Sequence, residues 1–120
     1  MKKLIVNDKN YFGFINDLPE GDKRIPHLLK QRKEQGFDYT ETWNLYGTIA
    51  SFSLPRLKEF RRQLAGVPMG LTKEEWIKIL DDIVAAFELI HADNFHDKKN
   101  IKIVDRGLNL FKKWFFSLWW

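Results

Sequence analysis

The chain has 120 residues, 44% of them hydrophobic and 15% aromatic, with a net charge of +4 and no cysteine. This size predicts one domain, residues 1–120, with a core that needs no structural metal, and the lack of cysteine excludes disulfide scaffolds, thiolate zinc sites and cysteine nucleophiles. Neither a secretion signal nor an apolar run of roughly 18 residues, which a bilayer span requires, is present, so we expect a soluble cytoplasmic protein without membrane contact.

The first 20 residues lack a helical period and predict a small extended arm or a hairpin. Leu4–Val6 and Tyr11–Ile15 are short β-prone runs, and the polar residues 7–10 between them could close a hairpin turn. A short helix, Pro26–Gln35, is predicted next, because proline favours a helix start and Gly36 favours its end.

The longest helical pattern begins at Thr40 or Thr42, either of which can cap it, and continues to Leu64. Pro55 interrupts this pattern and removes one backbone hydrogen bond. Because the apolar phase survives the proline, a kinked helix is favoured over two helices. The apolar positions expected to form its buried side are Trp43, Leu45, Ile49, Phe52, Leu57, Phe60 and Leu64.

Two further long helices complete the predicted fold. Thr72 and Glu75 form a capping box that begins a helix ending near His91, and the last helix covers Lys98–Leu118 although Gly107 weakens its interior. The predicted fold is therefore mainly α, a bundle of three long helices and one short helix with the N-terminal element described above.

The last eleven residues carry six aromatic side chains, which one helical face cannot point at a single core. Such an apolar excess favours contact with the rest of the domain, with a second copy or with a target protein. We expect a homo-oligomer, because apolar residues on two helix faces can close a symmetric assembly. The predicted interface residues are Phe111, Trp114, Phe115, Trp119 and Trp120, beside a core stripe of Ile101, Val104, Leu108, Phe111, Phe115 and Leu118.

A basic segment, residues 56–62, is the best candidate for binding an anion. Arginine forks match phosphate groups, and upstream aromatic rings can stack on a base, so the pattern suits a nucleotide-type ligand. The alternative is that these cations only form the solvated side of a helix. The candidate ligand-binding residues are Arg56, Lys58, Arg61, Arg62, Trp43 and Tyr46.

Signals for catalysis are weak. Glu88 and His91 match a Glu-x-x-His spacing, but the second such pair that di-iron sites need is missing, and His91 with His96 matches no standard metal spacing. The chain has no phosphate-binding glycine loop and no nucleophile elbow. We therefore predict no metal, no cofactor and no enzymatic activity, with a small enzyme built on Glu88, His91 and His96 as a remaining alternative.

Several elements together resemble a family of small tailed-bacteriophage proteins. They are residues 36–45, which include Thr-Trp-Asn-Leu, then Thr48–Ala50, Leu54–Lys58 and Leu71–Trp76, followed by the aromatic tail Phe115–Trp120. Members commonly carry aspartate where this chain has Tyr46. The resemblance implies a phage origin and action inside a bacterial host cell, and it supplies no catalytic residues.

A small phage protein without a catalytic motif is most simply a binding protein. We predict a non-enzymatic accessory protein that binds and blocks or sequesters a host component, as an inhibitor in counter-defence does. The component would be a host protein or a nucleotide-type signal. Nucleic-acid binding in phage replication or transcription is the alternative, and it predicts a contiguous basic face.

Overall fold

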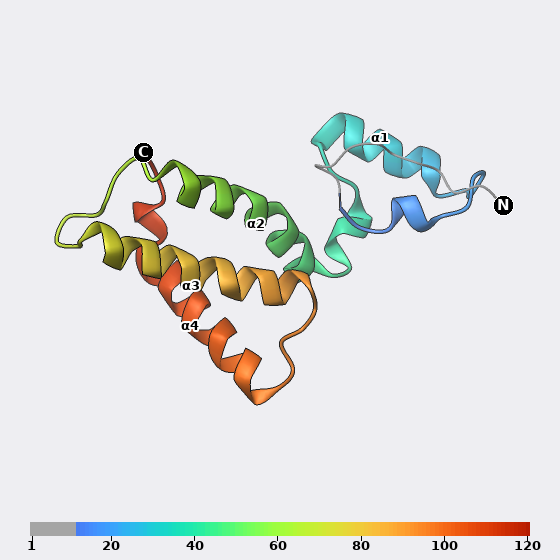
Figure 1. Ribbon diagram of the computed structural model, residues 1–120. Coiled ribbons are helices and arrows are strands. Elements are labelled where there is room, and N and C mark those ends of the chain that lie inside the picture. The colour runs from blue at the N-terminus through green and yellow to red at the C-terminus, as the bar shows by residue number, and fades with distance from the viewer. Residues whose placement is uncertain (1–11) are drawn as a thin grey trace. The chain divides into compact units, whose positions relative to one another are not determined.

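The computed structural model describes residues 12–120, most of which are helical (Figure 1). These residues contain no β-strand element, so the mainly α fold of three long helices and one short helix is confirmed. Within the same range, no helix has both the length and the apolar character needed to cross a membrane. The α-helices are α1 (Ile25–Gln35), α2 (Leu45–Gln63), α3 (Lys73–His91) and α4 (Lys98–Trp114), and the 3-10 helices are η1 (Ile15–Asp17), η2 (Tyr39–Thr42) and η3 (Phe115–Ser117).

The chain divides into two compact units, residues 1–48 and residues 49–120. Each has a cluster of buried apolar side chains of its own. The single domain expected from the chain length remains a prediction.

The first unit forms its core from η1, α1 and the turn between them. Four buried side chains make up the cluster, and Phe14 packs against it. The predicted end of α1 is confirmed, since Gly36 has a left-handed backbone (φ 84°) and its N–H donates to the Arg32 carbonyl. The buried residues are Ile15, Leu18, Ile25 and Leu28.

The β-prone run at Tyr11–Ile15 does not form a strand within the described residues. Ile15–Asp17 is a turn of 3-10 helix, because Ile15 points into the cluster of the first unit and local hydrogen bonds replace strand pairing. The other predicted run, Leu4–Val6, lies outside the residues that the structure describes.

The predicted caps of the long helix, Thr40 and Thr42, are wrong. Asp38 instead caps the short helix η2, where it accepts a hydrogen bond from the Thr40 N–H at 2.9 Å. The long helix α2 begins three residues after η2, and the Asn44 side chain accepts from the Gly47 N–H near its start. Asp38 precedes η2 and Asn44 precedes α2, and both residue types are favoured at helix N-caps.

Four polar residues are buried in the first unit and bond to one another. Arg32 Nε donates to Asp38 Oδ2 at 2.6 Å, and both side chains are excluded from solvent. Glu41 Oε2 accepts from the Asp38 N–H at 2.8 Å, which completes a capping box, and Thr40 donates its hydroxyl to Asp38. These pairings offset the cost of burying charge.

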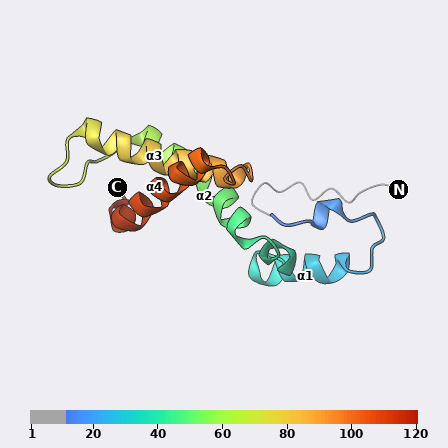
Figure 2. The same cartoon turned by 90° about the horizontal axis from the view of Figure 1, so that it is seen from below.

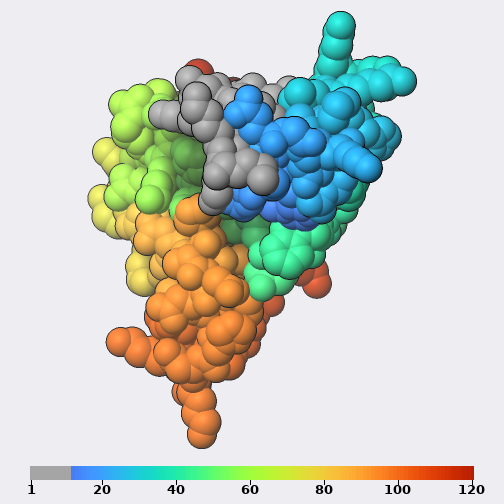
Figure 3. All heavy atoms as spheres, turned by 90° about the vertical axis from the view of Figure 1, so that its right-hand side faces the viewer, coloured from blue at the N-terminus to red at the C-terminus, as the bar shows by residue number. Residues whose placement is uncertain are grey.

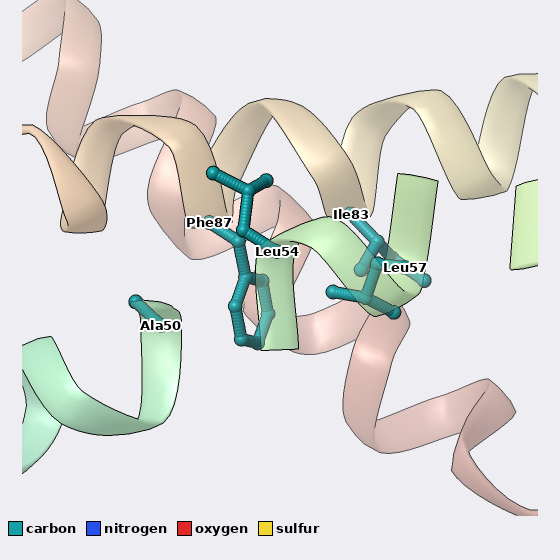
Figure 4. Close-up of a cluster of buried hydrophobic side chains, with 5 residues drawn as sticks. All are labelled: Ala50, Leu54, Leu57, Ile83 and Phe87. Atoms are coloured by element: carbon teal, nitrogen blue, oxygen red, sulfur yellow. The ribbon is translucent and has the colours of Figure 1, made fainter. Parts of the chain in front are cut away.

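The core of the second unit lies between α2 and α3 (Figure 4). The face of α2 that is buried differs from the predicted one. Ile49 and Phe52 are about half exposed, because the buried face of α2 follows Ala50, Leu54 and Leu57, which recur at steps of four and three residues. Pro55 lies inside one helix, which confirms the preference for a single helix over two, while the expected kink stays a prediction. The core side chains are Ala50, Leu54 and Leu57 from α2 with Ile83 and Phe87 from α3.

Helices α3 and α4 pack side by side, as Figures 1 and 2 show from two directions. Gly107 makes this close approach possible. A Cβ there would lie 2.6 Å from the Asp82 carbonyl oxygen and would also clash with Ala86. The glycine that weakens α4 in isolation therefore allows its closest contact with α3.

Both predicted boundaries of α3 hold, and one boundary of α4 differs. Thr72 and Glu75 form the predicted capping box, with N–H to side-chain distances of 2.9 and 3.1 Å. The α-helix α4 ends at Trp114 rather than Leu118, and the chain tightens into η3. A tight final turn of this kind is common where a helix ends.

Candidate functional site

The aromatic tail forms a series of ring contacts that leads from the core to the surface. Phe87 of α3 contacts Phe111 of α4, with ring centroids 5.1 Å apart. Phe111 contacts Phe115 at 5.3 Å, and Phe115 contacts Phe116 at 5.4 Å, each edge to face. Phe87 is buried, Phe115 is about half exposed and Phe116 is 90% exposed.

The five predicted interface residues separate into two groups. Phe111 packs against the core, and Trp114 meets the buried Trp76 edge to face at 5.8 Å, so both take part in packing inside the second unit. Phe115, Trp119 and Trp120 are exposed, the two tryptophans by 75% and 74%. The stripe expected to be buried divides similarly, since Val104, Phe111 and Leu118 pack inward while Ile101, Leu108 and Phe115 remain substantially exposed.

The exposed end of the tail meets the loop between α2 and α3. The last residues return to the end of α2, as Figure 1 shows. Together they line an open hollow of about 430 Å³, in which Met69 is fully exposed and Val67 is 40% exposed. We call this region the tail surface, defined by Ala65, Gly66, Val67, Pro68, Met69, Ser117, Trp119 and Trp120.

Three of the predicted anion-binding cations form ion pairs within the second unit. Lys58 Nζ lies 3.2 Å from a Glu88 oxygen, and Arg61 Nε lies 2.9 Å from an Asp81 oxygen, so both connect α2 to α3. Arg62 pairs with Glu59 at 2.6 Å on α2 itself. A carboxylate is therefore already beside each of these three cations, and an incoming anion would have to compete with it.

The pKa of Glu59 reflects this pairing. It lies below its usual value because the Arg62 guanidinium and the Gln63 amide donate hydrogen bonds to its carboxylate. The same contact raises the pKa of Arg62. Arg56 lies over the Phe52 ring, 3.8 Å from its centroid, and donates to the Phe52 carbonyl.

The two predicted stacking residues belong to the first unit. Trp43 is 72% exposed, and Phe14 meets its ring edge to face at 6.1 Å. Tyr46 is half exposed at the beginning of α2. The exposure needed for stacking is thus present, while the predicted basic residues all lie in the second unit.

The residues considered for catalysis have other contacts. His91 Nδ1 lies 2.8 Å from the Ser51 hydroxyl, Glu88 pairs with Lys58, and the His96 ring lies against Phe95 at 4.5 Å. Among residues 12–120, no group of three or more metal-ligating side chains is close enough together to hold a metal ion.

A second basic region lies on α4, and the sequence reasoning missed it. The helix carries six basic side chains against one acidic side chain, Asp105. In the described part of the chain none of the six forms an ion pair, in contrast to Lys58, Arg61 and Arg62 of α2. The six are Lys98, Lys99, Lys102, Arg106, Lys112 and Lys113.

The first four of these cations line an open hollow of about 630 Å³ together with Ile103. The sequence signal was their spacing, since Lys98, Lys102 and Arg106 recur every four residues and so share one side of a helix. The prediction for this helix was based on its apolar stripe and did not include the basic side. We call the face that the six cations form the α4 basic face.

Comparison of the chain with protein-family models, with curated proteins and with solved structures gave no match. The resemblance to phage proteins therefore depends on the sequence elements alone.

Proposed function

We propose that this chain is a non-enzymatic binding protein that blocks or sequesters a host protein through the tail surface. The observation that carries the proposal is the pair of exposed tryptophans, Trp119 and Trp120, beside an apolar hollow. Tryptophan contributes most when it is buried at the centre of an interface, and apolar patches on a surface mark contact sites.

The chemistry of the tail surface favours a protein over a nucleotide as the partner. Its lining is apolar apart from Ser117, and it contains no cation to meet a phosphate. Each exposed tryptophan has roughly 150–250 Å² to bury, which can anchor one side of a specific interface. A nucleotide-type signal would instead need the basic segment of α2, where Lys58, Arg61 and Arg62 already have carboxylate partners.

We infer a bacterial host and an inhibitory outcome of binding from the resemblance to small tailed-bacteriophage proteins. A phage protein acts in the bacterial cytoplasm, where occupying the surface of a defence protein is sufficient to inhibit it. The expected homo-oligomer is the competing explanation of the tail surface, because a second copy would also bury both tryptophans.

A matched pair of variants tests the proposal. The double variant Trp119→Ser/Trp120→Ser removes both anchors, and Trp43→Ser removes a tryptophan of similar exposure from the first unit. A host protein that copurifies would be purified separately and titrated against each variant by calorimetry. If each anchor contributes at least about 2 kcal/mol, the double variant should lose about a thousandfold in affinity and the control almost none.

Light scattering on a size-exclusion column measures the molar mass, which shows whether a second copy of the chain occupies the tail surface instead of a host protein. A dimer that the double variant converts to monomer, with no purified host protein bound, would assign the tail surface to a second copy and overturn the proposal. Equal affinity of the wild type and the double variant for the purified partner would also overturn it.

A further inference from the structure

We infer that the α4 basic face binds the phosphate backbone of a nucleic acid. This site is separate from the tail surface, and the inference does not depend on the proposed function. It also differs in place from the anion site predicted at residues 56–62.

The six cations of α4 occupy one side of the helix. At about 100° per residue, their positions fall within an arc of about 140°, and that arc contains only two other residues, Asp105 and Asn109. The opposite side packs on α3 through Val104, Gly107 and Phe111. The cations therefore form a single continuous surface on a helix that the core of the second unit holds in place.

The length and charge of this face match a nucleic-acid strand better than a single phosphate. From Lys98 to Lys113 the helix rises about 22 Å, and over this length the face carries six positive charges against the one negative charge of Asp105. One strand of duplex DNA carries one phosphate per roughly 3.4 Å of helix axis. A mononucleotide would contact only a fraction of these side chains.

The cations of α4 are also available for binding, whereas those of α2 are occupied. Asp105 is the one acidic residue on α4. On α2, by contrast, Lys58 pairs with Glu88 of α3 and Arg61 pairs with Asp81 of α3. In Figure 3, long side chains around the start of α4, drawn in orange, extend into solvent. A polyanion would thus meet cations without a carboxylate partner here, whereas Lys58, Arg61 and Arg62 of α2 each already have one.

An anionic membrane is the other polyanion that a basic helix can bind, and the packing argues against it. A helix that lies on a bilayer inserts its apolar side between the lipids. The centre of the apolar side of α4 is instead turned toward α3, with Val104 buried and Gly107 in contact with the α3 backbone, and only its edge, at Ile101 and Leu108, is about 40% exposed. Insertion of the whole apolar side would require the second unit to open.

The salt dependence of binding measures how many phosphates the protein contacts. If the four cations that line the hollow each contact one phosphate, log Kd should change with log salt with a slope of about 3.6 on duplex DNA and about 2.8 on a single strand. The full chain would be titrated by fluorescence anisotropy against a labelled duplex and against its single strands, made as DNA and as RNA. Comparing the Kd values at one salt concentration identifies the form of nucleic acid that is preferred, while each slope gives the number of phosphates contacted.

Two triple variants with the same change in charge locate the site. Lys99→Gln/Lys102→Gln/Arg106→Gln neutralises the α4 basic face, and it should weaken binding at least about tenfold and reduce the duplex slope by about 2.7. The control, Lys58→Gln/Arg61→Gln/Arg62→Gln, should change the slope by less than about one. Circular dichroism verifies that both variants remain folded, as expected for exposed side chains.

Each outcome decides the inference. The inference is supported if the slope of log Kd against log salt falls only in the α4 triple variant. The double tail variant Trp119→Ser/Trp120→Ser should keep the wild-type slope. No binding at low salt, equal slopes for both triple variants, or binding only to vesicles that contain phosphatidylserine would overturn it.

Discussion

Replacing Asp38 with alanine should destabilise the first unit strongly, because the carboxylate is the centre of the buried polar cluster. Asp38 is completely buried, and it accepts from Arg32 Nε at 2.6 Å and from the Thr40 N–H at 2.9 Å. Without it, the Arg32 guanidinium stays buried beside an apolar methyl group. The η2 helix also loses its cap.

The magnitude follows from the burial of both partners. Removing one member of a buried ion pair costs about 3–5 kcal/mol, because the remaining charge keeps its desolvation penalty. Losing the cap adds about 1 kcal/mol. Small proteins are stable by only about 5–15 kcal/mol, so Asp38→Ala should remove a large share of the stability of the first unit. Asp38→Asn should cost less, since its amide oxygen can still accept from Thr40.

Urea unfolding followed by circular dichroism, together with hydrogen exchange at α1 and η2, measures this loss. Glu34→Ala is the control, because the Lys30–Glu34 pair on α1 also joins a cation to a carboxylate but both of its side chains are more than 60% exposed. Its removal should change stability little, as is usual for surface pairs. If Asp38→Ala were as stable as the control variant, the burial of the Arg32–Asp38 pair would be refuted.

Two further predictions concern the second unit. Gly107→Ala should lower the free energy of unfolding by about 1–3 kcal/mol despite the better helix propensity of alanine, because the new Cβ clashes with the Asp82 carbonyl; an unchanged or higher urea midpoint would contradict this packing. The pKa of Glu75 lies below its usual value because the Thr72 N–H and then the Thr72 hydroxyl bond to its carboxylate. Its contribution is therefore complete above the unfolded pKa of about 4.3 and is lost as the pH falls through the lower folded value, so Glu75→Gln should reduce the loss of thermal stability on acidification. Equal pH profiles for the variant and the wild type would contradict a contribution of the Glu75 carboxylate to stability.

The sequence predicted those elements whose signals are local. Gly36 ends α1 and Thr72 begins α3 because a left-handed backbone and a capping box depend on only a few neighbouring residues. The caps at Thr40 and Thr42 were wrong because several residues there can cap a helix. Asp38 and Glu41 form a capping box, a local signal that was overlooked, and Asp38 also contacts Arg32, which no local rule includes.

The buried face of α2 shows why helical periodicity alone was insufficient. Ile49 and Phe52 are the larger side chains, yet Ala50 is buried, because it shares one face of α2 with Leu54 and Leu57 and this face packs with side chains of α3. Size and hydrophobicity describe a helix in isolation, while burial depends on its neighbour. Gly107 on α4 follows the same rule.

The candidate surfaces were predictable to different degrees. The excess of rings in the tail indicated that Trp119 and Trp120 would have no place in the core, since composition alone limits what a small core can hold. The pairing of Lys58 with Glu88 was not predictable, because it joins two helices 30 residues apart in sequence. The residues Asp38 and Thr40 lie within the element that resembles phage proteins, and the structure gives them a role in folding.

The placement of the tryptophans makes the chain its own spectroscopic reporter. Trp76 is sealed beside Trp114, whereas Trp119 and Trp120 face water. Emission from the sealed indole should respond when α3 and α4 separate, and emission from the two terminal indoles should shift to the blue when something covers them. Unfolding and occupancy of the carboxyl terminus can therefore be followed in one cuvette, without attaching a dye.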